Sequence, residues 1–190
     1  MDKRIEKTKH GIFNAFIELR SKKALERISV KELCELANIN KSTFYAHYLD
    51  IYDLSDKIEN EIAEQVMQGI DIDDLIKKPE SLPRELALIC TSKQPLISTI
   101  FSGSRTQELP RKILSAVISQ LCEKHPELAN DEKLKIMLTY SVFGGYYAFN
   151  ENRDCSDEAV IETLGEISGN LRIYVGLTGQ MICCIMKILL

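Results

Sequence analysis

The sequence has no apolar run of the length that a membrane-spanning helix needs. Such a helix takes roughly 20 consecutive apolar residues, and the longest candidate in this chain of 190 residues, MICCIMKILL at 181–190, is shorter and carries a lysine. The amino-terminal MDKRIEK is charged and lacks the following apolar region of a signal peptide. We expect no membrane partner. The tail 181–190 could cover a dimer seam, be disordered or be foreign to the domain, and these alternatives stay open.

Metal-ligand spacing is also lacking. The six cysteines stand at positions 34, 90, 122, 155, 183 and 184, and only one histidine, His125, is near a cysteine in sequence. With no secretory signal, reduced thiols in the cytosol are the expected state. We therefore expect a cytoplasmic protein without a metal or cofactor. A redox sensor using Cys122, Cys183 or Cys184 ranks last among the functions considered, because nothing positions a thiolate of low pKa.

No catalytic constellation is recognisable. The sequence shows no acid–base pair, no nucleophile–base spacing and no glycine-rich phosphate loop, so an enzyme is not expected. The composition, 45% apolar and 27% charged, is that of an ordinary globular protein. Residues 1–48 hold ten Lys or Arg against six Asp or Glu, whereas the whole chain has a net charge of −4. A basic amino-terminal segment followed by an acidic remainder is a weak indication of nucleic-acid binding.

Apolar residues recur at helical spacing over most of the chain, which predicts an all-α fold. The first helix has a stripe formed by Ile12, Phe13, Phe16, Ile17 and Leu19. The segment SVKE, Ser29 to Glu32, has the pattern of a capping box, in which Glu32 would reach back to the amide of Ser29. It predicts a short second helix that ends near Ala37. The apolar face of this helix consists of Val30, Leu33, Cys34, Leu36 and Ala37.

A third short helix is predicted from Lys41 to Tyr48, with Asn40 as its N-cap. Asp50 is expected to cap a fourth helix that runs to Gly69. Its apolar positions are Ile51, Leu54, Ile58, Ile62 and Val66. Two short helices joined by a tight turn are the arrangement of a helix-turn-helix.

The third helix has two different faces. Phe44 and Tyr48 are four residues apart and would anchor it on the core. The remaining side chains can all hydrogen-bond and would face outward: Lys41, Ser42, Thr43, Tyr45 and His47. Such a face suits contact with bases or phosphates. A merely solvated face is an equally good interpretation from composition alone.

The stretch ISVKELCELANINKSTFYAHYLDIYDL, residues 28–54, resembles the DNA-binding signature of TetR-type transcriptional regulators. That signature has the form I-T-V-x-x-I-A-x-x-A-G-V-S-x-G-T-F-Y-x-H-F-x-x-K-x-x-L. The matching positions are Ile28, Ser29, Val30, Leu33, Ala37, Ile39, Thr43, Phe44, Tyr45, His47, Tyr48 and Leu54. With the preceding helix, the resemblance covers roughly the first quarter of the chain.

The sequence also departs from the signature. Asn38 replaces a glycine at a position that is expected to need a left-handed backbone, which asparagine tolerates. Asn40 replaces the usual serine cap, and Ser42 adds a hydroxyl where glycine or alanine is common. Ile51 replaces a lysine that often lies near phosphate, and its neighbours Asp50 and Asp53 would repel phosphate. This departure motivates an alternative function without strong DNA contact.

The resemblance implies roles for particular residues. Lys41, Ser42 and Thr43 would meet bases or phosphates from the front of the recognition helix. Tyr45 and His47 would contact phosphate or base edges, unless Tyr45 is a packed core residue and His47 is merely solvated. Two further residues, Ser29 and Lys31, would hold the DNA backbone from the preceding helix.

The rest of the chain predicts a larger helical body. Helices are expected over 107–124, with Pro110 in the first turn, and over 131–150 and 157–176. The second of these holds a strip of small residues, around Gly144, that would let another helix approach closely. The resemblance to TetR-type proteins implies dimerisation through the last two long helices. The expected dimer residues are Gly144, Ala148, Val160, Leu164, Ile167 and Leu171. Packing within one chain is the alternative.

A pocket for a small-molecule effector is implied by the resemblance alone. Its candidate lining consists of Cys90, Phe101, Cys122, Tyr140, Phe143 and Tyr147, and for each of these core filling is the more ordinary role. The expected organisation is a DNA-binding helix-turn-helix domain at 1–50, a connecting helix at 51–69, and a ligand-binding and dimerisation domain at 70–190. The expected function is that of a homodimeric repressor, which binds a palindromic double-stranded DNA operator and is released by an effector. The alternative is a TetR-like interaction or coactivator protein that binds another regulator.

Overall fold

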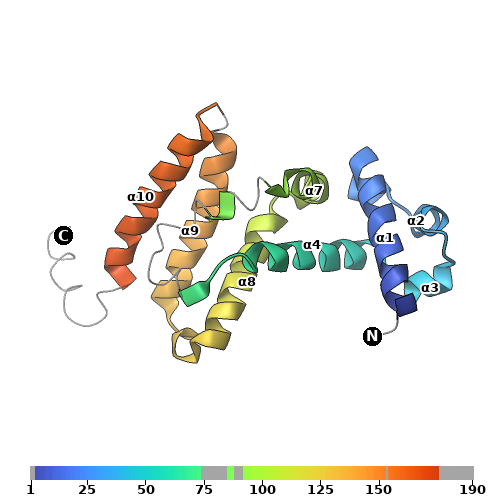
Figure 1. Ribbon diagram of the computed structural model, residues 1–190, viewed down its shortest axis with the longest axis horizontal. Helices are drawn as coiled ribbons and strands as arrows, with labels where there is room; N and C mark the ends of the chain where they lie inside the picture. Colours follow the sequence, from blue (N-terminus) through green and yellow to red (C-terminus); the bar gives the residue numbers. More distant parts are fainter. Residues whose placement is uncertain (1–2, 74–84, 88–91, 153, 176–190) are drawn as a thin grey trace. The chain divides into compact units, whose positions relative to one another are not determined.

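The computed structural model describes residues 3–73, 85–87, 92–152 and 154–175 (Figure 1). The side chains of the last helix are described as far as residue 168. All secondary structure within these ranges is helical, which confirms the predicted all-α fold class. The elements are α1 (Lys3–Lys22), η1 (Leu25–Arg27), α2 (Val30–Leu36), α3 (Lys41–Tyr45), α4 (Ile51–Met67), α7 (Gln94–Ile100), η3 (Gly103–Arg105), α8 (Glu108–Lys124), η4 (Pro126–Leu128), α9 (Glu132–Glu151) and α10 (Asp157–Val175), where η marks a single 3₁₀ turn.

The chain divides into two compact units. The first comprises Met1–Glu64 and Lys93–Lys112, and the second comprises Gln65–Ser92 and Ile113–Leu190. Residues 93–112 therefore group with the amino-terminal unit, although the sequence assigns them to the carboxyl-terminal region. The functional division into a DNA-binding domain at 1–50 and a ligand-binding domain at 70–190 stays a prediction.

The amino-terminal unit buries apolar side chains from all of its helices. Helix α1 packs against α2 and α7, and α2 packs against α3. The fully buried side chains include Ile12, Phe16, Leu25, Leu33, Phe44, Leu54 and Ile100. Burial of each such side chain stabilises the fold by about 1.5–3 kcal/mol. In the predicted stripe of α1, Phe13 and Ile17 are only half-buried.

Helix α2 begins at the predicted cap. The Ser29 hydroxyl accepts a hydrogen bond from the Glu32 amide at 3.2 Å. The contact expected between the Glu32 carboxylate and the Ser29 amide is replaced by another one. The carboxylate instead accepts a hydrogen bond from Lys23 Nζ at 2.5 Å. Leu36 was expected on the apolar face and is instead 43% exposed. After this helix Asn38 has a φ of 52°, the left-handed conformation predicted for it.

Helix α3 is shorter than predicted. It starts at Lys41, because the Asn40 side chain accepts a hydrogen bond from the Thr43 amide at 3.2 Å. It ends at Tyr45, three residues before the predicted end. There the Phe44 carbonyl accepts from the amides of both His47 and Tyr48, at 2.9 and 3.0 Å, so the chain tightens into a turn.

Helix α4 follows the predicted pattern. All five of its expected apolar positions are buried: Ile51, Leu54, Ile58, Ile62 and Val66. It also carries two buried polar residues that the pattern did not indicate, Ser55 and Glu59, both fully shielded from solvent. Their presence on a core-facing side requires partners.

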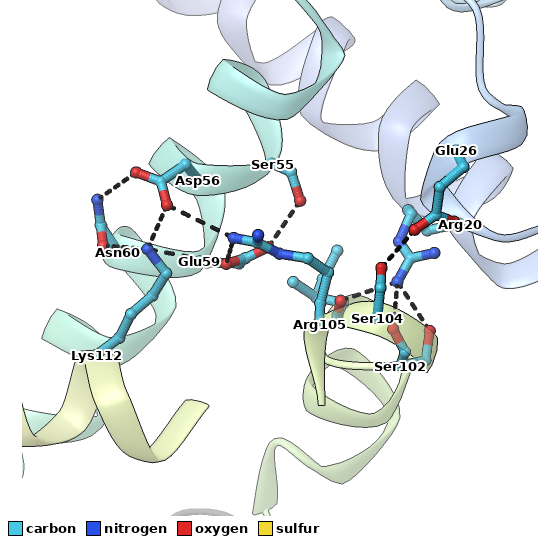
Figure 2. A network of polar contacts seen from close by, with 11 residues as sticks. Arg20, Glu26, Ser55, Asp56, Glu59, Asn60, Ser102, Ser104, Arg105 and Lys112 are labelled. Atoms are coloured by element: carbon cyan, nitrogen blue, oxygen red, sulfur yellow. Dashed lines mark hydrogen bonds and ion pairs between the residues drawn. The ribbon is translucent and has the colours of Figure 1, made fainter. Parts of the chain in front are cut away.

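One buried arginine, Arg20, and one half-buried arginine, Arg105, supply polar contacts between segments that are far apart in sequence (Figure 2). Arg20 of α1 donates from Nη2 to the Ile100 carbonyl at 3.0 Å and to the Ser102 hydroxyl at 2.8 Å. Arg105 of η3 donates to both oxygens of Glu59, from Nε at 2.8 Å and from Nη2 at 2.6 Å. Glu26 also accepts a hydrogen bond from the Ser104 hydroxyl. The segment 100–105 is thus held by α1 on one side and by α4 on the other.

The second unit contains most of α8 and the pair α9 and α10, which pack against each other. In α8 the side chains of Ile113, Val117 and Leu121 are buried, whereas Cys122 is half-buried. Asp131 is the N-cap of helix α9, and its carboxylate accepts a hydrogen bond from the Leu134 amide at 3.0 Å. Apart from the adjacent residues and the backbone of α9 itself, no heavy atom of the described residues lies within 4 Å of a Cβ placed on Gly144 or Gly145. Close helix approach at these glycines is thus not made by the described part of one chain.

Candidate nucleic-acid interface

The seven residues expected to contact DNA lie on two adjacent helices and their flanking turns. Two belong to the start of α2: Ser29 is its N-cap and Lys31 is in its first turn. The others follow in α3 and in the turn after it: Lys41, Ser42, Thr43, Tyr45 and His47. The packing of α2 against α3 therefore brings both groups into one region of the amino-terminal unit.

Exposure separates these residues into two classes. Lys41, Ser42 and Tyr45 are exposed, whereas Thr43 and His47 are half-buried. The exposed fraction of Tyr45 is 56%, which excludes the interpretation of this side chain as a packed core tyrosine. Its ring still contacts the buried Phe44 ring edge-on, with centroids 5.4 Å apart. The Tyr45 side chain is therefore packed on the core at one edge while more than half of it is exposed.

The hydroxyl groups at the start of α3 are held by the cap. Asn40 Oδ1 accepts from the Ser42 hydroxyl at 3.0 Å and from the Thr43 hydroxyl at 2.6 Å, in addition to the Thr43 amide. Each hydroxyl keeps oxygen lone pairs that can accept further hydrogen bonds. Sequence reasoning identified Asn40 as a cap but missed this second role, which orients the two neighbouring hydroxyls.

The two lysines of the region differ in their surroundings. Lys31 lies 3.9 Å from the Glu35 carboxylate, in an exposed pair one helical turn apart. Lys41 forms no ion pair within the described ranges. An exposed pair of this kind contributes little, so both ammonium groups remain accessible to an anion, with Lys41 the less compensated of the two.

The acidic residues at the start of α4 are engaged by backbone amides. Asp50 Oδ1 accepts from the Asp53 amide at 2.8 Å, as an N-cap does. Asp53 Oδ2 accepts from the Leu49 amide and from Lys57 Nζ, both at 2.9 Å. The hydrogen bond from Lys57, followed by that from Leu49, lowers the pKa of the Asp53 carboxyl. Both acids therefore have a local structural role that the sequence pattern did not reveal in full.

Lys57 is a second residue that sequence reasoning missed. Its Nζ donates to the His47 carbonyl at 3.2 Å and lies 5.1 Å from the centroid of the Tyr48 ring. Tyr48 itself is half-buried and stacks at a tilt on Phe44, with centroids 5.5 Å apart. The only sequence signal was the spacing of Asp53 and Lys57, four residues apart on one helix.

The described residues among those expected to line an effector pocket belong to both units. Cys90 lies outside the described residues, and Phe101 is buried in the amino-terminal unit. In the other unit, Cys122 and Phe143 are half-buried, whereas the exposed fractions of Tyr140 and Tyr147 are 61% and 40%. An effector site lined by these six residues stays a prediction.

The expected dimer residues lie on α9 and α10. Gly144 is exposed, and Ala148, Val160 and Leu164 are half-buried. Ile167 has an exposed fraction of 43%. The side chain of Leu171, and Cys183 and Cys184 of the redox alternative, lie outside the described residues.

The described ranges show neither a metal-binding cluster nor a membrane-spanning helix. They contain no cluster of three or more His, Cys, Asp or Glu side chains placed to bind a metal ion. No helix in them has the length and apolarity that crossing a membrane requires. Comparison of the whole chain with models of protein families, with curated proteins and with solved structures found no match.

Proposed function

We propose that this chain is a DNA-binding transcriptional regulator whose contact surface is formed by α3 and the start of α2. The observation that carries the proposal is the pair of short helices joined through the left-handed Asn38, with the polar side of the second helix exposed. The resemblance of residues 28–54 to TetR-type regulators supports the same function. In a helix-turn-helix the second helix enters the major groove with its amino-terminal residues at the base edges.

The chemistry of the exposed side of α3 fits an anionic partner. Lys41 supplies an uncompensated positive charge, and Ser42 and Thr43 supply oriented hydroxyls beside it. Tyr45 adds an accessible phenol at the other end of the helix. Phosphate contacts position such a helix, and hydrogen bonds to base edges select the sequence.

The proposal includes a homodimer formed through α9 and α10. Helix α9 exposes Ile136 by 68%, Tyr140 by 61% and Tyr147 by 40%. Together with Gly144 these residues recur at helical spacing and make an apolar stripe, which we call the α9 stripe. A second copy of the chain would bury it, and a two-fold dimer would present two recognition helices to a palindromic operator. Release by a small-molecule effector rests on the family resemblance alone.

The proposal is tested by selecting duplexes from fragmented genomic DNA and measuring their binding by gel shift. We expect one palindromic duplex to bind in the nanomolar range at moderate salt, well above a scrambled duplex of the same length. Equal binding of the two duplexes, or no binding, would contradict a sequence-specific regulator.

A specific observation favours a second candidate, an interaction protein that binds another regulator. Leu49 is 80% exposed and Tyr52 is 53% exposed, directly beside the candidate DNA surface. Contiguous exposed apolar surface marks protein contacts, and these two side chains would form part of such a surface. Under this alternative, Leu49→Glu would abolish binding of the partner regulator, and no duplex would be selected by the wild-type chain.

A further inference from the structure

Two side chains of α4, which we call the bracket, hold the segment that links α3 to α4. The bracket consists of Asp53 and Lys57, whose side chains pair at 2.9 Å. Asp53 accepts from the Leu49 amide at 2.9 Å, and Lys57 donates to the His47 carbonyl at 3.2 Å. One acidic and one basic side chain thus engage one donor and one acceptor of the same short link.

The bracket also reaches the aromatic residues under the candidate contact surface. Lys57 Nζ lies 5.1 Å from the centroid of the Tyr48 ring, within range of a cation–π contact. Tyr48 stacks on the buried Phe44, and Phe44 contacts Tyr45. The position of Lys57 is therefore connected, through side chains in contact, to the exposed phenol of Tyr45.

The charges of the bracket matter for an anionic partner. An unpaired Asp53 would place a negative charge at the start of α4, next to the surface that is proposed to meet phosphate. Lys57 neutralises that charge at 2.9 Å and leaves the carboxylate free to hold the Leu49 amide. The position where the TetR signature has a lysine carries Ile51, whose side chain is 4% exposed and cannot supply this charge.

We infer that Lys57 is a positioning residue for DNA binding. It offsets the charge of Asp53 and fixes the turn that carries His47. This inference rests on the proposed DNA-binding function. It concerns how the surface is held and charged, and it does not require Lys57 to touch the DNA.

The test is a double-mutant cycle on the full-length chain. Lys57→Gln, Asp53→Asn, the double variant and Lys57→Arg are compared by gel shift on the duplex selected with the wild-type protein. The matched control is the pair of Glu18 and Lys22 on α1, which has the same spacing, a distance of 2.7 Å and two exposed side chains. Glu18→Gln, Lys22→Gln and their double variant form the control cycle. Circular dichroism checks that each variant is folded.

We expect Lys57→Gln to weaken binding about fivefold or more, the size of one charge–charge interaction at a few ångström in water. Adding Asp53→Asn should recover most of this loss, because it removes the unpaired carboxylate and leaves an amide oxygen for Leu49. Lys57→Arg should stay within about twofold of the wild type, since arginine keeps the charge and donates hydrogen bonds. The control cycle should change affinity less than about twofold.

Two results would overturn the inference while leaving the proposed function intact. The first is wild-type affinity in Lys57→Gln. The second is a loss of affinity in Lys57→Gln that the added Asp53→Asn does not recover, together with a fall of about one in the slope of log affinity against log salt concentration. That combination would mark a direct contact between Lys57 and a phosphate. Failure of the wild-type protein to bind any duplex would overturn the proposed function and this inference together.

Discussion

The guanidinium of Arg105 meets the fully buried carboxylate of Glu59 with two parallel hydrogen bonds, at 2.8 and 2.6 Å (Figure 2). Ser55 donates a third hydrogen bond to Glu59 at 2.7 Å, and Lys112 Nζ lies 3.8 Å away. A carboxylate with these partners is satisfied although it is shielded from water. The contact joins α4 to residues more than 40 positions later in the chain.

Removal of Arg105 is expected to destabilise the protein strongly. Arg105→Ala leaves the buried Glu59 carboxylate without its main partner, which costs about 3–5 kcal/mol in such sites. The free energy of unfolding in urea measures the effect. Lys22→Ala, which breaks the exposed pair with Glu18, should cost only about 0.5 kcal/mol. A loss below about 1 kcal/mol for Arg105→Ala would show that the pair does not hold α4 in place.

Arg20 provides a separate prediction. Its guanidinium donates from Nη2 to the Ile100 carbonyl and to both oxygens of Ser102, and from Nη1 to the Lys23 carbonyl. The single ammonium of a lysine cannot reproduce this planar fork of two nitrogens. We expect Arg20→Lys to lower the free energy of unfolding by about 2 kcal/mol, because charged hydrogen bonds at a buried site are lost. Ser102→Ala, which removes only one acceptor, should cost about 1 kcal/mol. Equal stability of Arg20→Lys and the wild type in the same urea titration would refute the role given to the fork.

The second unit should show a pH dependence that centres on His125. The imidazole contacts Asp73 Oδ1 at 2.8 Å and Glu127 Oε1 at 3.3 Å. The hydrogen bond to Asp73, with that to Glu127, raises the pKa of His125 above 6.5. Protonation therefore favours the folded state: the contribution is complete below pH 6.5 and is lost as the pH rises through the folded pKa.

The measurement is an NMR titration of the His125 ring in the wild type and in Asp73→Asn. We expect the midpoint to fall in the variant, because its hydrogen-bond partner is then neutral. The stability difference between the wild type and His125→Asn should also be larger at about pH 6 than at about pH 8. An unchanged midpoint would mean that Asp73 and His125 do not pair in solution.

The proposed dimer gives a prediction for the α9 stripe. Tyr140→Glu should convert a dimer to a monomer, because a charge cannot be buried at the centre of an apolar interface without a partner. Sedimentation velocity measures the mass, and circular dichroism should show unchanged helix content. Thr139→Glu introduces the same charge at the adjacent exposed position and is the matched control. A wild-type monomer at micromolar concentration would contradict the dimer.

The sequence predicts local features of this fold where a single residue type suits a particular backbone position, such as a helix cap or a left-handed turn. The caps at Ser29 and Asn40, and the left-handed Asn38, belong to this class. The apolar pattern likewise predicted the buried side of α4. These features depend on contacts within a few residues, and a periodic pattern contains that information.

Contacts across long sequence separations could not be predicted in this way. Nothing near Glu59 indicates that its partner is Arg105, and nothing near Arg20 indicates the carbonyl of Ile100. A buried polar residue on an apolar face signals only that some partner exists. The exact end of α3 was also missed, because the chain tightens into a turn at the Phe44 carbonyl within the range expected to be helical.

The central claim is that the exposed side of α3 binds DNA, and the most direct test is the affinity of Lys41→Ala and Tyr45→Ala for the selected duplex. We expect each variant to weaken specific binding about tenfold or more, as loss of a phosphate or base contact does. Tyr45→Phe, which keeps the ring on Phe44, should separate the hydroxyl from the packing contact. The variants should keep the wild-type mass in ultracentrifugation. Wild-type affinity in both alanine variants would contradict the assignment of α3 as the recognition helix.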